Sequence, residues 1–279
     1  MKKRIVIYCA SGYGERVALS LDEEKYEIVA YSDSNPEIWN KRLHGGVVLP
    51  PNRLLEIDFD FIVISLSIYA DKIREDLTER YNIDARKIIV YNALFDGIEW
   101  DEERIIELRK CIRMLKERNI PGNMAEVGVY QGDFSRLFNY YFPDKKLYLF
   151  DTFEGFDSKK NKVNECDREL FKDTSVELVL SKMKKPENCV VRKGFFPSTA
   201  KGLEETFCLV SLDTDLYEPT MEGLEFFYPR LQKGGYIFVH DFGSYHFEGV
   251  KDAVYKFCEN NDAAIVPLAD RCLSVIICK

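Results

Sequence analysis

The chain is poor in several features that would assign it to a familiar class of protein. None of its eight cysteines forms a CxxC pair, and most lie in apolar runs such as TFCLVS and VIICK. This pattern indicates buried, reduced thiols and a cytoplasmic protein. No apolar run approaches the length of a membrane span, and the short one after MKKR passes directly into a strand–turn–helix pattern, unlike a signal peptide. The net charge of −8 argues against nucleic acid or an anionic membrane as the main partner.

What is present, over residues 1–92, is an alternation of strands and helices. Four segments have the apolar, partly β-branched runs typical of strands: RIVIYCA, YEIVAYSD, FDFIVISLS and RKIIVYN. Helices are predicted over SGYGERVALSLDE and IYADKIREDLTERYN, and a loop over SNPEIWNKRLHGGVVLPP, which contains two glycines and three prolines. Such alternation implies a parallel sheet with right-handed crossovers, and therefore a Rossmann-like N-terminal domain.

Residues 93–120 are predicted to connect this domain to a second one. Apolar residues recur on one helical face, at Ile105, Leu108, Ile112 and Leu115. Acids in the first turn and basic residues near the end match the helix dipole, and Pro121-Gly122 ends the helix. A second α/β series follows over residues 121–279, and its last two strands, AAIVPLA and LSVIICK, are separated only by DRC and must be antiparallel. The predicted fold is therefore α/β, with two Rossmann-like units in series.

A glycine-containing turn follows the first strand of the second series, in EVGVYQGDFSRLF. Gly128 and Gly132 let the backbone pass close to a ligand near the N-terminus of the next helix. Nineteen residues after Gly132 the following strand ends at Asp151, where an acid can accept hydrogen bonds from both hydroxyls of a ribose. The turn lacks the third glycine of a dinucleotide site and is preceded by Glu126. It therefore favours a nucleoside without phosphates that carries positive charge, such as S-adenosylmethionine, over a tight turn with no ligand.

Acidic groups follow two later strands of this series. LVSL is followed by Asp213 and Asp215, and YIFV by His240 and Asp241; the helix-like EPTMEGLEFFYPRL and a predicted turn, QKGG, lie between them. In open α/β sheets the ligand site lies beyond the carboxyl ends of the strands, so the four groups are expected to converge. Carboxylates gathered there repel one another unless a cation or a proton lies between them. The cluster can therefore bind Mg²⁺ or act as a base, and either role would ready an alcohol hydroxyl to attack a methyl sulfonium.

The other histidines and one polar segment carry weaker signals. His240 alone among the three histidines follows a strand directly, where its alternative role is a hydrogen bond to the backbone. His44 and His246 lie in loop-like contexts and are predicted at the surface. Residues 157–175 are polar and aperiodic and follow a strand end on the ligand side, which fits either a lid or a disordered surface insertion.

Five segments occur in a fixed order between residues 118 and 279: AEVGVYQGDF, LFDTFEGFD, VRKGFFPSTA, SLDTDLYEPTMEGLEFFYPRLQKGGYIFVHDFG and PLADRCLSVIICK. In these segments the chain resembles the macrocin O-methyltransferase family, which methylates sugar hydroxyls of macrolides and related glycans with S-adenosylmethionine. The resemblance implies a class I S-adenosylmethionine-dependent methyltransferase fold with an antiparallel terminal strand pair. It also implies cofactor binding at Glu126, Gly128 and Asp151. The whole predicted cofactor site comprises Glu126, Gly128, Gly132, Asp151, Thr152 and Phe153.

The resemblance further implies a divalent metal at Asp213 and at the pair after the fifth strand, with Asp213 doubling as the base. Antibiotic-pathway members of the family carry two adjacent aspartates in that pair, whereas this chain has His240-Asp241. Imidazole is a softer ligand, better suited to transition metals. The predicted catalytic and metal-binding residues are Asp213, His240 and Asp241, with Mg²⁺ or another divalent cation favoured over a proton shuttle without metal.

The N-terminal domain resembles the nucleotide-binding-like domain that precedes some sugar-modifying acyltransferases and glycan-pathway enzymes. Its first turn, Cys9-Ala-Ser11-Gly-Tyr-Gly14, keeps only the last glycine of a dinucleotide motif, while Asp33 holds the position of a ribose-binding acid. NAD binding is therefore disfavoured. A docking domain, or one that holds a nucleotide-sugar or a carrier portion of the substrate, is expected.

The combined prediction is an S-adenosylmethionine-dependent O-methyltransferase. Its expected substrate is a sugar hydroxyl of a glycan, nucleotide-sugar or glycosylated metabolite, in a polysaccharide or secondary-metabolite pathway. Two alternatives stay open: a glycan- or nucleotide-sugar-binding protein that has lost catalysis, which the His240 departure allows, and an NAD-dependent oxidoreductase, which Cys9 and Ser11 disfavour. No nucleic-acid partner and no membrane insertion are expected, and the amphipathic connector helix offers a surface for a second subunit.

Overall fold

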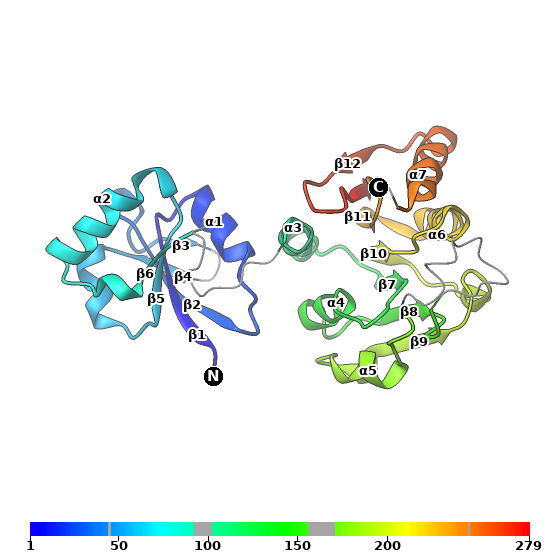
Figure 1. The fold of residues 1–279 in the computed structure, drawn as a ribbon, viewed down its shortest axis with the longest axis horizontal. Helices are drawn as coiled ribbons and strands as arrows, with labels where there is room; N and C mark the ends of the chain where they lie inside the picture. Colours follow the sequence, from blue (N-terminus) through cyan, green and yellow to red (C-terminus); the bar gives the residue numbers. More distant parts are fainter. Residues whose placement is uncertain (44–45, 92–101, 156–170, 245) are drawn as a thin grey trace. The chain divides into compact units, whose positions relative to one another are not determined.

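The structure is a computed structural model of the 279-residue chain and describes residues 1–43, 46–91, 102–155, 171–244 and 246–279. The chain divides into two compact units, Met1–Lys110 and Cys111–Lys279. In its described part, each unit is built around one β-sheet flanked by helices (Figure 1). No helix within the described ranges combines the length and the apolar composition needed to cross a membrane.

The sheet of the N-terminal unit has the strand order β3-β4-β2-β1-β5-β6. The four predicted parallel strands are confirmed as β1 (Lys3–Tyr8), β2 (Tyr26–Ser32), β5 (Phe61–Ile64) and β6 (Ile88–Val90). The loop predicted between β2 and β5 is wrong in part, because it contains β3 (Arg42–Leu43) and β4 (Gly46–Leu49). β4 pairs in parallel with β2 and buries Val48. Its apolar, β-branched run extends the sheet despite the flanking glycines and prolines.

Helices cover both faces of this sheet and confirm the two predicted ones. α1 (Gly12–Leu19) packs Val17 and Ala18 against one face. α2 (Ala70–Glu75) continues as a π-helical turn, Asp76–Arg80, and this segment packs against the other face. Short 3₁₀ helices complete the connections at Pro36–Ile38, Pro51–Glu56, Ser67–Tyr69 and Ala85–Lys87.

The predicted amphipathic helix is confirmed as α3 (Glu103–Glu117), while residues 92–101 lie outside the described ranges. Three residues of the predicted apolar stripe are buried: Leu108, Ile112 and Leu115. Ile105 is only half-buried, and its neighbour Ile106 is buried instead. The helix therefore uses a wider apolar face than the single stripe that its spacing predicts.

The sheet of the C-terminal unit has the strand order β12-β13-β11-β10-β7-β8-β9. Its parallel strands are β7 (Asn123–Val127), β8 (Leu147–Asp151), β9 (Cys189–Lys193), β10 (Phe207–Leu212) and β11 (Leu231–Val239). β12 (Ile265–Pro267) and β13 (Val275–Cys278) are antiparallel, as predicted. The turn predicted at QKGG is wrong, because these residues lie within β11, where an irregular register with β10 absorbs both glycines.

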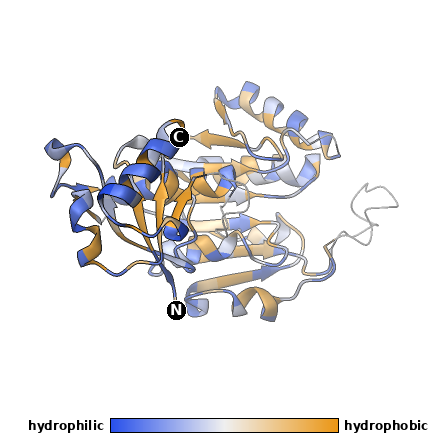
Figure 2. Cartoon of the chain, turned by 60° about the vertical axis from the view of Figure 1, so that its left-hand side comes forward, coloured by the Kyte–Doolittle hydropathy of each residue, from blue (hydrophilic) through white to orange (hydrophobic). Residues whose placement is uncertain are grey.

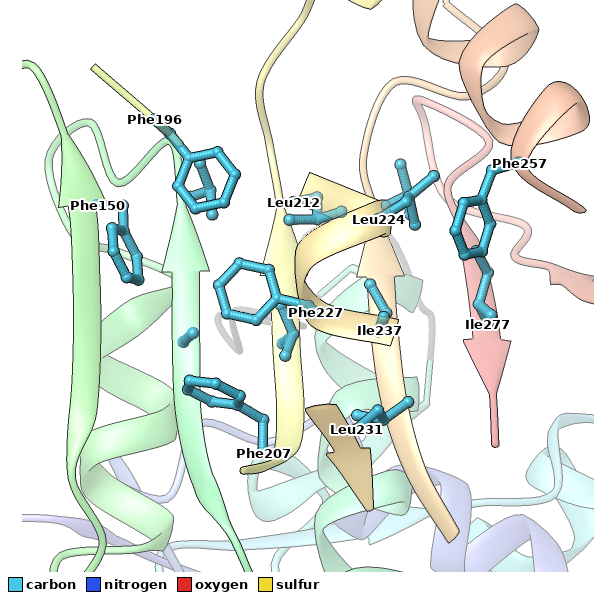
Figure 3. Packing of buried hydrophobic residues seen from close by; sticks show 14 of the residues in the cluster. Phe150, Phe196, Phe207, Leu212, Leu224, Phe227, Leu231, Ile237, Phe257 and Ile277 are labelled. Carbon is cyan, nitrogen blue, oxygen red and sulfur yellow. The ribbon is translucent and has the colours of Figure 1, made fainter. Parts of the chain in front are cut away.

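One face of this sheet carries an aromatic core under two helices. α6 (Tyr217–Arg230) and α7 (Glu248–Asn261) supply Phe227 and Phe257 to it. Figure 3 shows the Phe227 ring among Phe150, Phe196 and Phe207, with ring centroids 5.0–6.0 Å away. Burial of each such ring contributes about 1.5–3 kcal/mol. This core fixes the relative positions of the strands whose ends carry the predicted site.

The opposite face packs against α4 (Ser135–Tyr141). Phe134, the N-cap residue of this helix, makes an edge-on ring contact with Phe238 of β11. α5 (Val176–Ser181) lies beside the turn that precedes α4, with Val179 fully buried there. Two short 3₁₀ helices complete the unit at Pro186–Asn188 and Ser198–Ala200. Figure 2 shows that the strands are mostly hydrophobic, whereas the helices combine hydrophobic and hydrophilic residues. That contrast is expected for a sheet covered on both faces.

The strand order reverses direction at β7. From β7 the chain crosses to β8 and β9 on one side, and it later returns to β10 and β11 on the other. In such sheets ligands bind at the carboxyl ends of the strands, where the order reverses. Val127 of β7 and Leu212 of β10, which are register partners, mark this point.

Candidate active site

The end of β7 is joined tightly to the end of β10 at Gly128. The Asp213 N–H donates to the Val127 carbonyl at 2.9 Å, and the Gly128 N–H donates to the Phe150 carbonyl of β8 at 2.9 Å. Gly128 has φ +81°, and a Cβ there would lie 1.8 Å from the Asp213 carbonyl oxygen. Only glycine fits this position, which brings the predicted cofactor turn and the predicted base into backbone contact.

Gly132 also has a packing reason within the protein. Its φ is +78°, and a Cβ there would lie 2.9 Å from Cγ1 of Val179 on α5. The missing side chain therefore lets α5 approach the turn. Direct contact of Gly128 or Gly132 with a cofactor stays a prediction.

Asp151 organises the turn from the end of β8. Its Oδ2 accepts hydrogen bonds from the N–H groups of Val129 (2.7 Å) and Tyr130 (2.9 Å), and its Oδ1 accepts one from Phe153 (2.7 Å). Tyr130 and Phe153 have φ of +48° and +53°. These charge-assisted bonds hold both residues in a conformation that bulky side chains otherwise avoid. The carboxylate is half-buried, and its contact with a ribose stays a prediction.

The other predicted cofactor residues surround this arrangement. Thr152 donates its hydroxyl to the Gly155 carbonyl at 2.9 Å, and Phe153 is buried. Glu126 is 2% exposed and accepts a short hydrogen bond from the Ser135 hydroxyl at the start of α4. The Glu126 carboxylate therefore links β7 to α4, and its contact with a cofactor stays a prediction.

The predicted catalytic residues meet at the ends of β10 and β11. His240 Nδ1 lies 3.0 Å from Asp213 Oδ1 and 2.7 Å from Asp241 Oδ2. The His240 and Asp213 side chains are 20% and 26% exposed, so the group is accessible, while Asp241 lies deeper at 8%. The expected convergence of Asp213, His240 and Asp241 is therefore present in the structure. Two carboxylates fix the imidazole from one side.

Asp215 adds a third carboxylate to this group. Oxygen atoms of Asp213, Asp215 and Asp241 all lie within 4.8 Å of one another. Burial raises the pKa of Asp215 well above its usual range, and the neighbouring Asp213 and Asp241 carboxylates raise it further. Both Asp215 and Asp241 have left-handed backbone conformations, with φ of +59° and +57°. Such strained residues cluster at functional sites. Three carboxylates this close repel one another unless a proton or a cation lies between them.

Comparison with known proteins identifies the chain. The family model described as macrocin O-methyltransferase (TylF) matches residues 99–269, more than half of the chain. The chain belongs to the macrocin O-methyltransferase family. It is therefore an S-adenosylmethionine-dependent O-methyltransferase, which confirms the resemblance and the predicted cofactor. A second family model, described as C2185-like, N-terminal, matches residues 1–89.

Individual relatives agree with membership of the macrocin O-methyltransferase family. The 8-demethyl-8-(2,3-dimethoxy-alpha-L-rhamnosyl)-tetracenomycin-C 4'-O-methyltransferase of Streptomyces olivaceus is 26% identical over 222 residues, which are 68% of this chain and 84% of that protein. The demethyldecarbamoylnovobiocin O-methyltransferase of Streptomyces niveus is 23% identical over 208 residues, 65% and 79% of the two chains. The solved structure of the O-methyltransferase NovP superposes with a TM-score of 0.54 at 22% identity and covers 76% of this chain and 98% of its own. This likeness confirms the class I methyltransferase fold.

One residue beside the Asp213–His240–Asp241 group was not among the residues predicted from the sequence. Cys272, in the hairpin between β12 and β13, lies with His240 and Asp241 so that one ligand atom of each is within 4.8 Å of the others. Burial raises the pKa of its thiol to about 11, and the Asp241 carboxylate, which accepts a hydrogen bond from it, adds to the effect. The antiparallel pairing of β13 with β11 carried a usable signal. The residues before β13 must lie near the end of β11, where His240 follows.

Two weaker predictions concern the surroundings of the site. His246 is exposed, as predicted, whereas His44 lies outside the described residues. Of the predicted lid or insertion over 157–175, residues 156–170 lie outside the described ranges as well. Residues 171–175, the described part of this segment, contact the predicted cofactor turn at Tyr130. The Tyr130 hydroxyl donates to Asp173 at 2.8 Å, and Phe171 packs edge-on against the Tyr130 ring.

The N-terminal unit repeats the turn arrangement of the methyltransferase unit. Asp33 Oδ2 accepts a hydrogen bond from the Ala10 N–H at 2.9 Å, as Asp151 does from the N–H groups of its own turn. Cys9 has φ +71°, and a Cβ on Gly14 would lie 2.6 Å from the Cys9 carbonyl oxygen. The one retained glycine is therefore required by packing. Binding of a nucleotide or carrier group there stays a prediction.

We expect Asp151→Ala to lower cofactor affinity, because the turn loses the acceptor of three backbone N–H groups. A hydrogen bond to a charged group contributes about 1.5–3 kcal/mol, which corresponds to a loss of roughly 10–100-fold in affinity. Calorimetric titration with S-adenosylhomocysteine measures this change. Asp33→Ala removes the equivalent carboxylate of the other unit and should leave the affinity unchanged. Wild-type affinity in Asp151→Ala would contradict the assigned role.

Proposed function

We propose that this enzyme methylates a sugar hydroxyl of a glycan, nucleotide-sugar or glycosylated metabolite, in a polysaccharide or secondary-metabolite pathway. The observation that carries the proposal is the joining of the cofactor turn to the Asp213–His240–Asp241 group through Gly128. The relative from Streptomyces olivaceus, whose name places a rhamnosyl group on its substrate, supports a sugar acceptor. A glycan- or nucleotide-sugar-binding protein without catalysis is the alternative, and absence of transfer to every sugar acceptor despite cofactor binding would favour it.

The residues of the site divide the reaction between them. S-adenosylmethionine supplies a methyl group on a positively charged sulfur. We assign its binding to the turn at Gly128 and Gly132, to Asp151 and to the neighbouring Glu126, Thr152 and Phe153. Asp213 accepts the hydroxyl proton as the O–C bond forms and the S–C bond breaks, so that the product ether is neutral. His240 Nδ1 lies 3.0 Å from Asp213 and can take the proton onward, and the Asp241 carboxylate, 2.7 Å from the same nitrogen, then accepts a hydrogen bond from the imidazolium.

A divalent cation fits the same group of residues. Three carboxylates within 4.8 Å of one another offer the oxygen ligands that Mg²⁺ takes. We propose Asp213, His240 and Asp241 as ligands, with Asp215 beside them. A bound cation would lower the pKa of a coordinated hydroxyl and orient it.

Removal of metal tests the cation. We expect dialysis against EDTA to reduce methyl transfer at least about tenfold, which is less than the usual effect of a lost catalytic group. Mg²⁺, Mn²⁺ or Zn²⁺ added back in turn should restore it. Transfer of the labelled methyl group from S-adenosylmethionine to a panel of glycosides and nucleotide-sugars measures the change. Full activity in EDTA would contradict metal assistance and leave the Asp213–His240–Asp241 proton route.

We further propose three parts for the chain: an N-terminal domain over 1–92, a connector over 93–120 and the methyltransferase domain over 121–279. The N-terminal domain would hold a nucleotide-sugar or carrier portion of the substrate, since Asp33 occupies the position of a ribose-binding acid. The seven described cysteines are thiols rather than disulfides, which supports a cytoplasmic enzyme. We also propose that a second subunit packs against α3, and sedimentation analysis of the oligomeric state tests this.

A further inference from the structure

The hairpin between β12 and β13 brings a thiol to the rim of the site. A ligand atom of Cys272 lies within 4.8 Å of one from His240 and one from Asp241. Ligand distances to Zn²⁺ are about 2.0–2.3 Å, so two atoms bound to one ion lie about 3.3–3.8 Å apart. The three side chains therefore need only small adjustments to hold a single ion. Their donors are a thiol, an imidazole and a carboxylate.

The turn that carries Cys272 is held by its own hydrogen bonds. Asp270 is 5% exposed, and it accepts bonds from the Ser274 N–H at 2.7 Å and the Ser274 hydroxyl at 2.6 Å. The Leu268 N–H donates to the Ser274 carbonyl at 2.8 Å and closes the loop. Buried, charge-assisted bonds of this kind make a rigid support. Cys272 is thus presented by a preformed turn.

The same turn is fixed to the segment that follows His240-Asp241. The Gly243 N–H donates to the Cys272 carbonyl at 3.1 Å. A Cβ on Gly243 would lie 2.4 Å from Cβ of Leu273, so a larger residue there would push the two segments apart. Rigid support of ligands from separate elements is what a metal site requires.

The donor set differs from the all-oxygen set beside it. Asp213, Asp215 and Asp241 form a carboxylate group suited to Mg²⁺, whereas thiolate and imidazole favour Zn²⁺ and related transition metals. We propose that Cys272 joins His240 and Asp241 in binding a transition-metal dication of the zinc and cobalt class, which makes this a site of mixed sulfur, nitrogen and oxygen ligands. The proposal rests on the proposed metal-assisted function and specifies its metal. When the S–metal bond forms, the thiol releases its proton to solvent.

Cobalt is the probe, because thiolate-bound Co²⁺ has a sulfur-to-metal charge-transfer band in the near ultraviolet, in addition to visible d–d bands. Full-length protein is freed of metal with EDTA, desalted and titrated with Co²⁺ under reducing conditions. We expect the charge-transfer band to reach saturation at one equivalent. Cys272→Ser should abolish that band and weaken Co²⁺ binding about 10–100-fold in competition with a chelator. Cys278→Ser, which changes an exposed thiol on the same hairpin, should match the wild type.

The outcomes separate this proposal from the proposed function. Saturable Co²⁺ binding without a charge-transfer band, no Co²⁺ binding, or an unchanged band in Cys272→Ser would each overturn the mixed-ligand site. Transfer supported by Mg²⁺ in those cases would leave the proposed function intact. Conversely, a charge-transfer band that depends on Cys272, in a protein that methylates no sugar acceptor, would support the site and reject the function. Near-ultraviolet circular dichroism of each variant confirms that its fold is retained.

Discussion

Asp213→Ala is expected to lower methyl transfer about 10²–10⁴-fold, the usual contribution of a positioned general base, while cofactor binding stays within a few-fold of wild type. The Asp213 carboxylate lies 3.0 Å from His240 and is the proposed proton acceptor. Its backbone holds the end of β7 through the Asp213 N–H and the close approach at Gly128, and the substitution leaves that backbone in place. The Asp213→Ala variant should therefore still bind the cofactor but transfer the methyl group much more slowly.

Two measurements and two further variants make the Asp213 prediction specific. Single-turnover transfer at saturating S-adenosylmethionine reports the chemical step, and calorimetry with S-adenosylhomocysteine reports binding. Asp213→Asn keeps the shape and loses the charge, so it should be as inactive as the alanine variant if the carboxylate acts as base or metal ligand. Asp252→Ala, at an exposed position on α7, controls for loss of a surface charge. Turnover near the wild-type level in Asp213→Ala would reject the assignment of the base.

The strand ends that form the site were predictable because buried parallel strands have a strong local pattern. Apolar runs that stop at Asp213 and at His240 place both residues beyond the carboxyl ends of their strands, and adjacency of β10 and β11 brings them together. The same reasoning locates Asp151 and the glycine turn. A local sequence pattern therefore suffices to predict which strand ends, and which of their polar residues, lie together.

Other features depend on contacts that no local pattern records. Cys272 reaches the site through the register of β13 on β11, and the short strand β4 forms because Val48 finds a buried position beside β2. Glu126 has the sequence context of a cofactor ligand, yet the structure pairs it with Ser135. Asp151 matches a ribose-binding position, and in the structure its carboxylate accepts hydrogen bonds from three backbone N–H groups in and next to the turn. In each case the tertiary fold determines which groups a polar or apolar residue contacts, and the local sequence does not.

Gly128→Ala is expected to destabilise the C-terminal unit severely and to abolish both cofactor binding and transfer. An L-residue at positive φ costs about 1–2 kcal/mol by itself. The added methyl group would lie 1.8 Å from the Asp213 carbonyl oxygen, and a backbone carbonyl cannot rotate aside as a side chain can. Relief requires β7 and β10 to separate at the bond between Asp213 N–H and the Val127 carbonyl. We expect a total loss of more than about 3 kcal/mol, a large share of the 5–15 kcal/mol that holds most domains folded.

Gly202→Ala is the matched control for Gly128→Ala. Gly202 has φ +76°, close to the +81° of Gly128, but a Cβ there would meet no atom within 4 Å. It should therefore show only the cost of the backbone conformation. Hydrogen exchange measured by mass spectrometry reports the two units separately: peptides from residues 123–151 should lose protection in Gly128→Ala, whereas peptides from residues 1–92 should not. Equal protection in the two variants would mean that β7 and β10 accommodate the added methyl group without loss of stability. It would contradict the inference that the cofactor turn and the catalytic base are tightly packed at Gly128.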